Sequence, residues 1–294
     1  MNDYVLFTDS DCDLSSETAA KAGYFLISMP YLIGETCICP WEDFTTFDAH
    51  AFYDLLRSGT VPTTCSVNTE RYMEYFEPVF ASGKDIVYVH FSNQMSSTLQ
   101  NMALALERLK ERYSQRRLYA IDTLSASACA RNVALAIADL AAGGASPEEL
   151  VAWSEREVEH FVCLSVLDDL KYLVRGGRLP GFTGSIAQVL GVKPIVYVDT
   201  DGITKSCAKA RGRHGVLRYL LGCMQALAFD PEKYRVIISH ADAQEAARDL
   251  EKAILGAYGD VAEILIDNIN PTVGCHLGPG AMVLSFYGSG RKPS

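Results

Sequence analysis

The strongest constraint on the fold is a short apolar run that leads through a hydroxyl-rich loop into a helix. Ile86–Phe91 is β-branched and aromatic, the composition of a central parallel strand. Ser92–Thr98 follows, and apolar residues then recur at helical spacing: Leu99, Met102, Ala103, Leu106, Leu109 and Tyr113. Ser96 or Ser97 is the expected N-cap, because a serine oxygen can accept from a first-turn amide. Cap and anion-binding roles both remain open for these serines.

The same pattern recurs twice, which predicts a layered α/β domain with a parallel sheet. Tyr4–Phe7 precedes the polar loop Thr8–Ser15, and Leu118–Thr123 precedes Ser-rich residues and an alanine-rich helix that ends near Ala142. In such sheets, ligands lie beyond the carboxyl ends of the strands. The loops expected to share that edge are Thr8–Ser15, Ser92–Thr98 and Asp122–Ser127.

The segments between these units are less regular. Helices are expected from Ser15 or Ser16 to about Ala22, over Ala49–Arg57 and over Glu70–Phe80. One strand is expected over Phe25–Leu32. The polar residues of Gly34–Asp48 predict an irregular excursion, and Thr60–Asn68 a loop.

After a helix over Glu148–Glu159 the pattern changes, which predicts a second domain. Asp199–Gly202 has the composition of a hairpin turn between two strands, Pro194–Val198 and Ile203–Ala208. Further strands are expected over Phe161–Val166, Arg235–His240, Ala262–Ile266 and Ala281–Tyr287, and helices over His214–Ala228 and Ala243–Tyr258. We therefore expect an N-terminal α/β domain, residues 1–158, with a mostly parallel sheet. Residues 159–294 are expected to form an α+β domain with a mixed sheet.

Charge and cysteine content narrow the classes of partner. A net charge of −10 argues against nucleic acid or an anionic membrane surface as a partner. The chain shows no signal peptide and no apolar run of membrane-spanning length. Nine scattered cysteines without a Cys-x-x-Cys pair indicate reduced thiols in the cytoplasm and no metal site.

An acidic run after the first strand leaves an enzymatic alternative open. Asp9 and Asp11 could act as nucleophile and acid/base of an Mg²⁺-dependent, haloacid-dehalogenase-like phosphohydrolase. Asp168 or Asp169 could then add metal ligands and Lys193 the cation. Short acidic runs are more often turns and helix caps. No glycine-rich phosphate loop or G-x-S-x-G nucleophile elbow occurs in the sequence.

Two further segments allow both a structural and a functional interpretation. Leu170–Leu179 reads as a helix ended by two glycines, with Arg178 just beyond, either solvated or paired with a carboxylate or phosphate. His276 lies in the glycine-rich run Gly274–Gly280, which is either a tight connection between strands or a place where the backbone approaches a ligand. His90 is expected to be a hydrogen-bonded core residue.

Taken together, these segments resemble the DegV family of bacterial fatty-acid-binding proteins over nearly the whole chain. Thr8–Ser15 is similar to the family's T-D-S-x-x-D-L motif, and Ser92–Thr98 is similar to S-S-x-L-S-G-T, with Ser97 in place of glycine. Thr64 and Cys65 stand at the T-S motif, with Cys65 in place of serine. Four further segments are similar to family motifs. Leu173–Arg178 is similar to L-x-x-G-G-R and Gly191–Ile195 to L-x-I-K-P-I. Lys209–Gly212 is similar to K-x-R-G and His276–Gly280 to H-x-G-P-G.

The resemblance implies a carrier with no cofactor and no chemistry of its own. It implies one long-chain fatty acid in an apolar tunnel between the domains, with its carboxylate held by Thr64 and Ser96. We expect His276 beside that headgroup, and four further residues near it: Ser92, Ser97, Cys65 and Gly278. The family implies presentation of the acid to a fatty acid kinase for phospholipid synthesis. Candidate residues for kinase docking or phosphate contact are Arg178, Arg211, Asp9 and Ser10. A third alternative is a chain that keeps the fold and binds another small anion.

Overall fold

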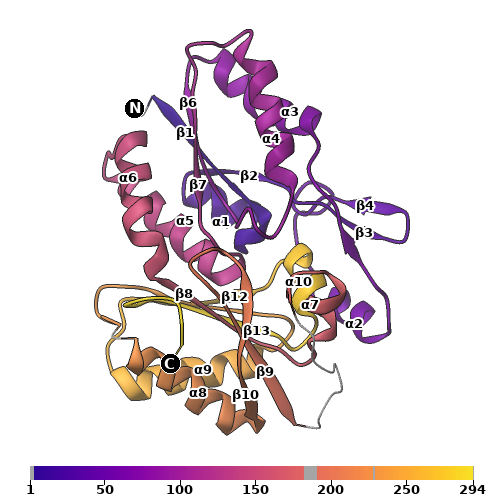
Figure 1. Ribbon diagram of the computed structural model, residues 1–294, viewed down its shortest axis with the longest axis vertical. Helices are drawn as coiled ribbons and strands as arrows, with labels where there is room; N and C mark the ends of the chain where they lie inside the picture. Colours follow the sequence, from indigo (N-terminus) through magenta and orange to yellow (C-terminus); the bar gives the residue numbers. More distant parts are fainter. Residues whose placement is uncertain (1–2, 182–190, 228, 294) are drawn as a thin grey trace.

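The N-terminal half is built around a four-stranded parallel sheet. In a computed structural model of the chain, which describes residues 3–181, 191–227 and 229–293, the strand order is β2-β1-β6-β7 and every pair is parallel. These strands are β1 (Tyr4–Asp9), β2 (Tyr24–Ile27), β6 (Asp85–His90) and β7 (Leu118–Asp122). The predicted parallel sheet is confirmed (Figure 1).

Helices cover both faces of this sheet, which explains why its central strand is apolar throughout. Ile86 and Tyr88 of β6 pack under α3 (Thr69–Ala81) and α4 (Thr98–Lys110). Val87 and Val89 point to the other face. The helices on that face are α1 (Ser16–Lys21), α5 (Ser127–Ala142) and α6 (Pro147–Glu157). A strand buried on both sides loses the alternation of a half-exposed strand.

The C-terminal half contains a six-stranded mixed sheet in the order β10-β9-β8-β13-β11-β12. All its pairs are antiparallel except β11 with β12. The strands are β8 (Phe161–Val166), β9 (Val192–Val198), β10 (Thr204–Arg211), β11 (Val236–His240), β12 (Ile264–Asn268) and β13 (Met282–Tyr287). The predicted mixed sheet, and with it the α/β fold class, is confirmed.

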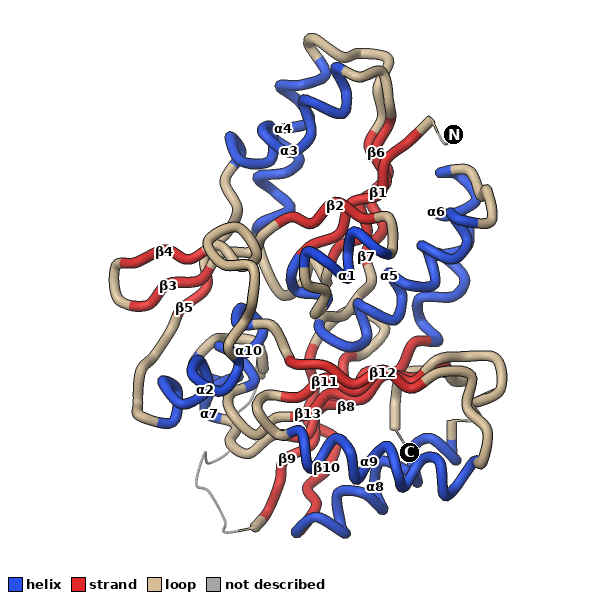
Figure 2. Tube along the Cα trace, turned by 180° about the vertical axis from the view of Figure 1, so that it is seen from behind, coloured by secondary structure: helices blue, strands red, loops and turns tan. Residues whose placement is uncertain are grey.

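The two faces of this second sheet have different neighbours. Val162, Leu164 and Val166 of β8 pack under α8 (Gly212–Ala226) and α9 (Gln244–Tyr258). Phe161 and Cys163 point to the opposite face, toward α5. A short 3₁₀ turn, η2 (Val158–His160), precedes β8. Helix α5 therefore lies between the two sheets (Figures 1 and 2). Ala228, the last residue of the helix expected over His214–Ala228, lies outside the described residues.

The prediction of one strand over Phe25–Leu32 is wrong. The chain leaves the parallel sheet after β2, and Pro30, which has no N–H to donate, precedes a separate strand. This is β3 (Tyr31–Ile33), which pairs with β4 (Thr36–Ile38) and β5 (Thr63–Thr64) in a third, antiparallel sheet. The expected irregular excursion and loop therefore each contain a short strand, with α2 (Ala49–Arg57) between them as predicted.

The glycine-rich run near the C-terminus was expected to be a connection or a ligand loop, but most of it is helical. Helix α10 (Pro271–Leu277) begins at Asn270, whose Oδ1 accepts from the amide of Val273 at 3.0 Å. It ends at Gly278, where φ is 77°. It packs against α2 and against α7 (Lys171–Arg175). The C-terminal segment thereby reaches the N-terminal half of the fold.

Candidate functional site

A cavity of about 290 Å³ lies where the two halves of the fold meet. The carboxyl edge of the parallel sheet contributes Phe91 and the loops after β6 and β7, and α10 contributes one side. The inner face of the mixed sheet forms the far wall, through alternate residues of its strands: Cys163, Ser165, Val196, Val198 and Val283. Its size lies near the lower end of the roughly 300–1,000 Å³ typical of small-molecule sites.

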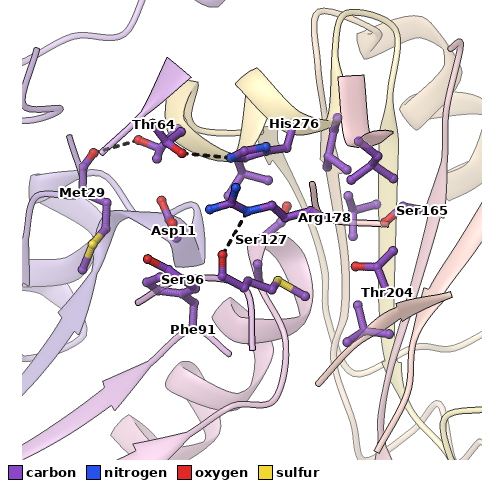
Figure 3. A pocket seen from close by; sticks show the side chains of 18 of the residues that line it. Asp11, Met29, Thr64, Phe91, Ser96, Ser127, Ser165, Arg178, Thr204 and His276 are labelled. Carbon is purple, nitrogen blue, oxygen red and sulfur yellow. Dashed lines mark hydrogen bonds between the residues drawn. The ribbon is translucent and has the colours of Figure 1, made fainter. Parts of the chain in front are cut away.

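Polar side chains gather at one end of this cavity. Thr64, Ser96, Arg178, His276 and Asp11 surround that end, while Ser165 and Thr204 lie at the opposite side (Figure 3). Much of the remaining lining is apolar: Met29 and Phe91 lie beside the polar end (Figure 3), and Val196, Val198, Leu277 and Val283 also line the cavity. The cavity therefore has a polar end and an apolar body.

His276 and Thr64 are held together at the polar end. The Oγ1 of Thr64, on β5, lies 3.1 Å from Nε2 of His276, on α10. Burial, and then the charges of Arg178 and Arg175, lower the pKa of His276 to about 3. The imidazole is therefore neutral at pH 7. Its Nδ1 is buried and has no hydrogen-bond partner among the described atoms.

Arg178 supplies the positive charge of the polar end. It follows the glycines that end α7, and its Nε donates to the carbonyl of Met95 at 3.0 Å. A second nitrogen donates to the carbonyl of Gly176. Burial lowers the pKa of its guanidinium, and the charge of Asp11 acts the other way. Within the described part of the chain, no carboxylate lies within ion-pair distance of it. Arg178 lines the cavity and is partly exposed, and its expected contact with a phosphate or a docked kinase stays a prediction.

Asp11 faces the same end, in surroundings that favour its protonated form. Burial, followed by the charges of Asp9 and Asp13, raises the pKa of its carboxyl well above the usual range. Its Oδ1 is buried without a hydrogen-bond partner in the described structure. A protonated carboxyl can donate a hydrogen bond to a bound anion, whereas a carboxylate would repel one.

The other members of the acidic run hold the scaffold together. Asp9 accepts from the amides of Phe91 and Asp11, each at 3.1 Å, which fixes the end of β6 against the turn η1 (Ser10–Cys12). Burial, opposed by these bonds, raises its pKa to about 7. Asp13 accepts from the amide and the Nδ2 of Asn270, each at 2.8 Å.

Full burial also corrects one expectation for this run. Asp9 and Ser10 have no exposed surface, and the Ser10 hydroxyl accepts from the amide of Met29 at 2.9 Å. Neither side chain can touch a docking partner in this conformation, so their expected role in kinase docking is wrong for this structure.

The geometry does not assemble the metal site that a phosphohydrolase would need. Asp168 pairs with Lys193, and Asp169 pairs with Lys171 at 3.0 Å. In the described ranges, the one group of three or more potential ligands is His50, Asp54 and Asp242, away from Asp9 and Asp11.

The remaining predicted headgroup residues divide into two groups. Ser97 and Cys65 line the cavity, and the Ser96 hydroxyl, which also lines it, accepts from the amide of Thr98 at 3.2 Å. Ser92 and Gly278 do not line it. Ser92 is buried and donates to the carbonyl of Gly202 at 3.0 Å, and Gly278 lies against the ring of Tyr172. Of the N-cap predictions, Ser97 occupies the cap position of α4 without a side-chain bond.

Other positions fall outside the cavity or were missed. Arg211 is exposed at the junction of β10 and α8. His90 is buried, with Nδ1 2.7 Å from the carbonyl oxygen of Phe91, as expected of a core histidine. Asp11, Ser127 and Thr272 line the cavity but were not expected there. The signal for the first two was present, since they lie in loops predicted to share one sheet edge, and Ser127 does donate to Asp13.

Comparison with known proteins gives the family. A family model described as an uncharacterised protein of the DegV family matches residues 4–289. The chain belongs to the DegV family. A DegV domain-containing protein of Clostridium perfringens is 30% identical over 293 residues, covering 100% of both chains. One from Caldanaerobacter subterraneus is 27% identical over 286 residues, which is 97% of this chain and 99% of the relative.

Solved structures of the DegV family share this fold. A fatty-acid-binding DegV protein of Thermus thermophilus superimposes with a TM-score of 0.86 at 22% identity, covering 98% of this chain and 100% of that one. The Streptococcus pneumoniae fatty acid kinase B3 protein, loaded with linoleic acid, gives 0.83 at 18% identity, with 98% and 99% covered. Among the described residues, no helix combines the length and apolarity that crossing a membrane requires.

Proposed function

We propose that this DegV-family protein binds one long-chain fatty acid and presents its carboxylate to a fatty acid kinase. The observation that carries the proposal is the asymmetry of the cavity, with Thr64, Ser96, His276 and Arg178 at one end and apolar side chains along its body. That distribution matches a molecule with one charged end and a long hydrocarbon tail.

The polar end suits a carboxylate in particular. A buried unpaired charge is heavily penalised, so the bound headgroup needs donors and a counter-charge. Thr64, Ser96 and neutral His276 are the proposed donors, and Asp11, whose pKa is raised, can add another in its protonated form. Arg178, which has no carboxylate partner in the described structure, is the proposed counter-ion. Fixed donors around an arginine form a more selective site than a charged surface patch.

The apolar body supplies most of the affinity. Each buried methylene contributes roughly 0.8 kcal/mol, so a long acyl chain gains roughly 10 kcal/mol before the cost of ordering it. The wall that would contact the tail comes from β9 and β13, while Met29 and Phe91 are apolar residues beside the polar end. We propose that residues 1–158 and 159–294 are two domains and that the tunnel runs between them.

The position of the polar end favours transfer of the headgroup to a partner. Ser97 is exposed, and Cys65 and Ser66 are partly exposed, although all three line the cavity. A carboxylate at this end lies close to the surface, where a kinase could phosphorylate it while the tail stays buried. Among the solved relatives, one is itself described as a fatty acid kinase B3 protein. Arg211, which is exposed, stays our candidate for kinase docking.

Binding titrations test the headgroup assignment. Oleic acid should bind the wild type much more tightly than oleyl alcohol, and Thr64→Val with Ser96→Ala should remove most of that difference. Thr60→Val, whose hydroxyl lies outside the cavity, is the control and should behave as wild type. Equal affinity for acid and alcohol in the wild type would contradict a carboxylate site.

A coupled assay tests the partner. With ATP and a fatty acid kinase catalytic subunit, the wild type should support acyl-phosphate formation. Arg211→Glu should reduce the rate without changing oleate affinity. Arg218→Glu, at an exposed position on the adjacent helix α8, should leave the rate unchanged. No acyl phosphate from an oleate-loaded wild type would count against the kinase role and leave the binding role standing.

A further inference from the structure

Two buried cysteines meet under the apolar part of the cavity. Cys129 lies in the first turn of α5, and its thiol donates to the carbonyl of Phe161 at 3.4 Å. Cys163 lies two residues further along the same strand, on the face of β8 that is turned toward α5. The two side chains are 0% and 2% exposed, and their thiols interact with each other. They form a dithiol between helix α5 and strand β8 of the mixed sheet.

A buried arginine without a carboxylate partner lies beside this pair. Arg291 is 1% exposed and donates to the main-chain carbonyls of Leu124, Thr123, Val158 and Asp199. Its Nε has no partner among the described atoms, and no ion pair is found for it in that part of the chain. A fully buried cation normally has an anion nearby. The charge of Arg291 acts to lower the pKa of both thiols.

This surrounding favours one thiolate in the pair. Burial raises the pKa of Cys129, but the hydrogen bond with Cys163 and the charge of Arg291 outweigh it and lower that pKa to about 6. The pKa of Cys163 moves well above its usual range, because its hydrogen bond with Cys129 and its burial both favour the protonated thiol. Among the described cysteines with a shifted pKa, Cys129 is the one whose value falls. Nearby positive charge is what makes protein thiols reactive.

Cys163 connects this pair to the cavity. It is part of the wall, two residues before Ser165, which also lines the cavity and lies across from Val196. A bound acyl chain would therefore pass the sulfur of Cys163, which is hydrogen-bonded to Cys129. An oxidising group carried on the bound acyl chain would be held beside this sulfur for as long as the ligand stays bound. A fatty acid hydroperoxide is such an oxidant.

We propose that Cys129 and Cys163 form a redox-active pair that reduces a hydroperoxide on an acyl chain bound in the cavity. This inference rests on the proposed fatty-acid-binding function. A proton passes from Cys163 to Cys129, and the Cys163 thiolate attacks the terminal peroxide oxygen. The O–O bond breaks, and the alkoxide takes the proton from Cys129 to give a hydroxy fatty acid. The Cys129 thiolate then attacks the Cys163 sulfenic acid, which forms the disulfide and releases hydroxide, protonated by solvent.

The electron balance of this step is closed within the protein and its ligand. The dithiol loses two electrons to the peroxide bond, and the products are one disulfide, one hydroxy fatty acid and one water. A single turnover needs no other reactant, and an added dithiol such as dithiothreitol restores the starting state. The oxidised protein carries a covalent link between α5 and β8 at the cavity wall.

The experiment uses reduced, delipidated full-length protein and linoleic acid hydroperoxide. We expect one equivalent of hydroxy fatty acid and a disulfide-linked pair of peptides containing Cys129 and Cys163, both measured by mass spectrometry. The rate should exceed that with an equal concentration of hydrogen peroxide by at least about tenfold, because binding holds the peroxide beside the thiols. Cys129→Ser and Cys163→Ala should each abolish the disulfide. Cys223→Ser, at a buried position on α8, is the matched control and should leave it unchanged.

A parallel titration with unoxidised linoleic acid separates this inference from the function on which it rests. Tight binding of linoleic acid without any Cys129–Cys163 disulfide would overturn the redox inference and leave the carrier function intact. A disulfide that forms equally fast with both peroxides would overturn the acyl-bound route. Failure to bind linoleic acid would overturn the proposed function and this inference with it.

Discussion

Replacing Gly176 with alanine perturbs the polar end of the cavity without replacing any residue proposed to contact the ligand. Gly176 ends α7 with φ of −74°, a conformation that alanine adopts without strain. A Cβ at this position would lie 2.8 Å from Cε1 of His276 and closer still to its Nδ1, and 3.2 Å from the carbonyl oxygen of Tyr172. The imidazole must therefore move away from its place beside Thr64.

The cost follows from the bond that this displacement breaks. The Thr64–His276 contact is 3.1 Å, close to the limit of a useful hydrogen bond, so a shift of several tenths of an ångström ends it. His276 would then no longer reach the carboxylate. A hydrogen bond to a charged group is worth about 1.5–3 kcal/mol. The dissociation constant for oleic acid should rise by roughly 10- to 150-fold, at one decade per 1.4 kcal/mol.

Displacement of a fluorescent fatty acid measures this change directly. Gly222→Ala is the matched control, because a Cβ there has no atom within 4 Å and the residue lies within helix α8. Thermal unfolding checks that Gly176→Ala is folded. Wild-type affinity in a folded Gly176→Ala variant whose crystal structure shows a displaced His276 would refute the placement of His276 at the carboxylate.

Three further predictions concern the charge, the protonation state and the length of the site. Arg178→Gln should weaken oleate binding by at least about 30-fold, because loss of one partner of a buried ion pair costs about 2–5 kcal/mol. Binding of oleyl alcohol should change little. An equal loss of affinity for both ligands would contradict a counter-ion role. Because the pKa of His276 falls to about 3 in the folded chain, the unfolded chain binds an extra proton between about pH 6.5 and pH 3. Acidification through that window should therefore lower the free energy of unfolding by up to about 1.4 kcal/mol per pH unit, as measured by urea unfolding. The His276→Gln variant should lose this slope. An unchanged slope in the variant would assign the pH dependence to other groups. Val198→Phe narrows the apolar part of the cavity and should lower the affinity for an 18-carbon acid about fourfold for each methylene displaced. Shorter acids should bind as before. Equal losses of affinity at all chain lengths in titrations would place the tail elsewhere.

Local sequence patterns were sufficient for the parts of the fold that form from neighbouring residues. The run Ile86–Phe91 predicted a buried parallel strand because a strand covered on both faces needs apolar residues at every position. Helix α2 was predicted at its observed bounds, Ala49–Arg57. Its apolar residues recur at helical spacing, and Asp48 caps its first turn by accepting from the amide of Ala51.

Pairing between distant segments could not be predicted in this way. Strands β4 and β5 are three and two residues long, too short to show a periodicity, and they form because β3 pairs with both. Helix α10 was missed although its signal was present, since Asn270 before Pro271 is a helix start. The glycine-rich run Gly274–Gly280 instead favoured a connection between strands or a ligand loop.

The candidate site shows the same division. Thr64, Ser96 and His276 were selected by the family resemblance, because no spacing rule connects β5, the loop before α4 and α10. The structure brings them to one end of one cavity, and their contact with a carboxylate stays a prediction. The position of Arg178 could not be derived, because it depends on how α7 packs against α10 and on the carbonyl of Met95.

Organic extraction of the purified protein followed by mass spectrometry tests the proposed function most directly. If the chain is a fatty acid carrier, the wild type should release close to one equivalent of long-chain fatty acid. Folded protein with Thr64→Ala and Ser96→Ala should release far less. A wild type that yields no fatty acid and takes up none when oleic acid is added would contradict the carrier function.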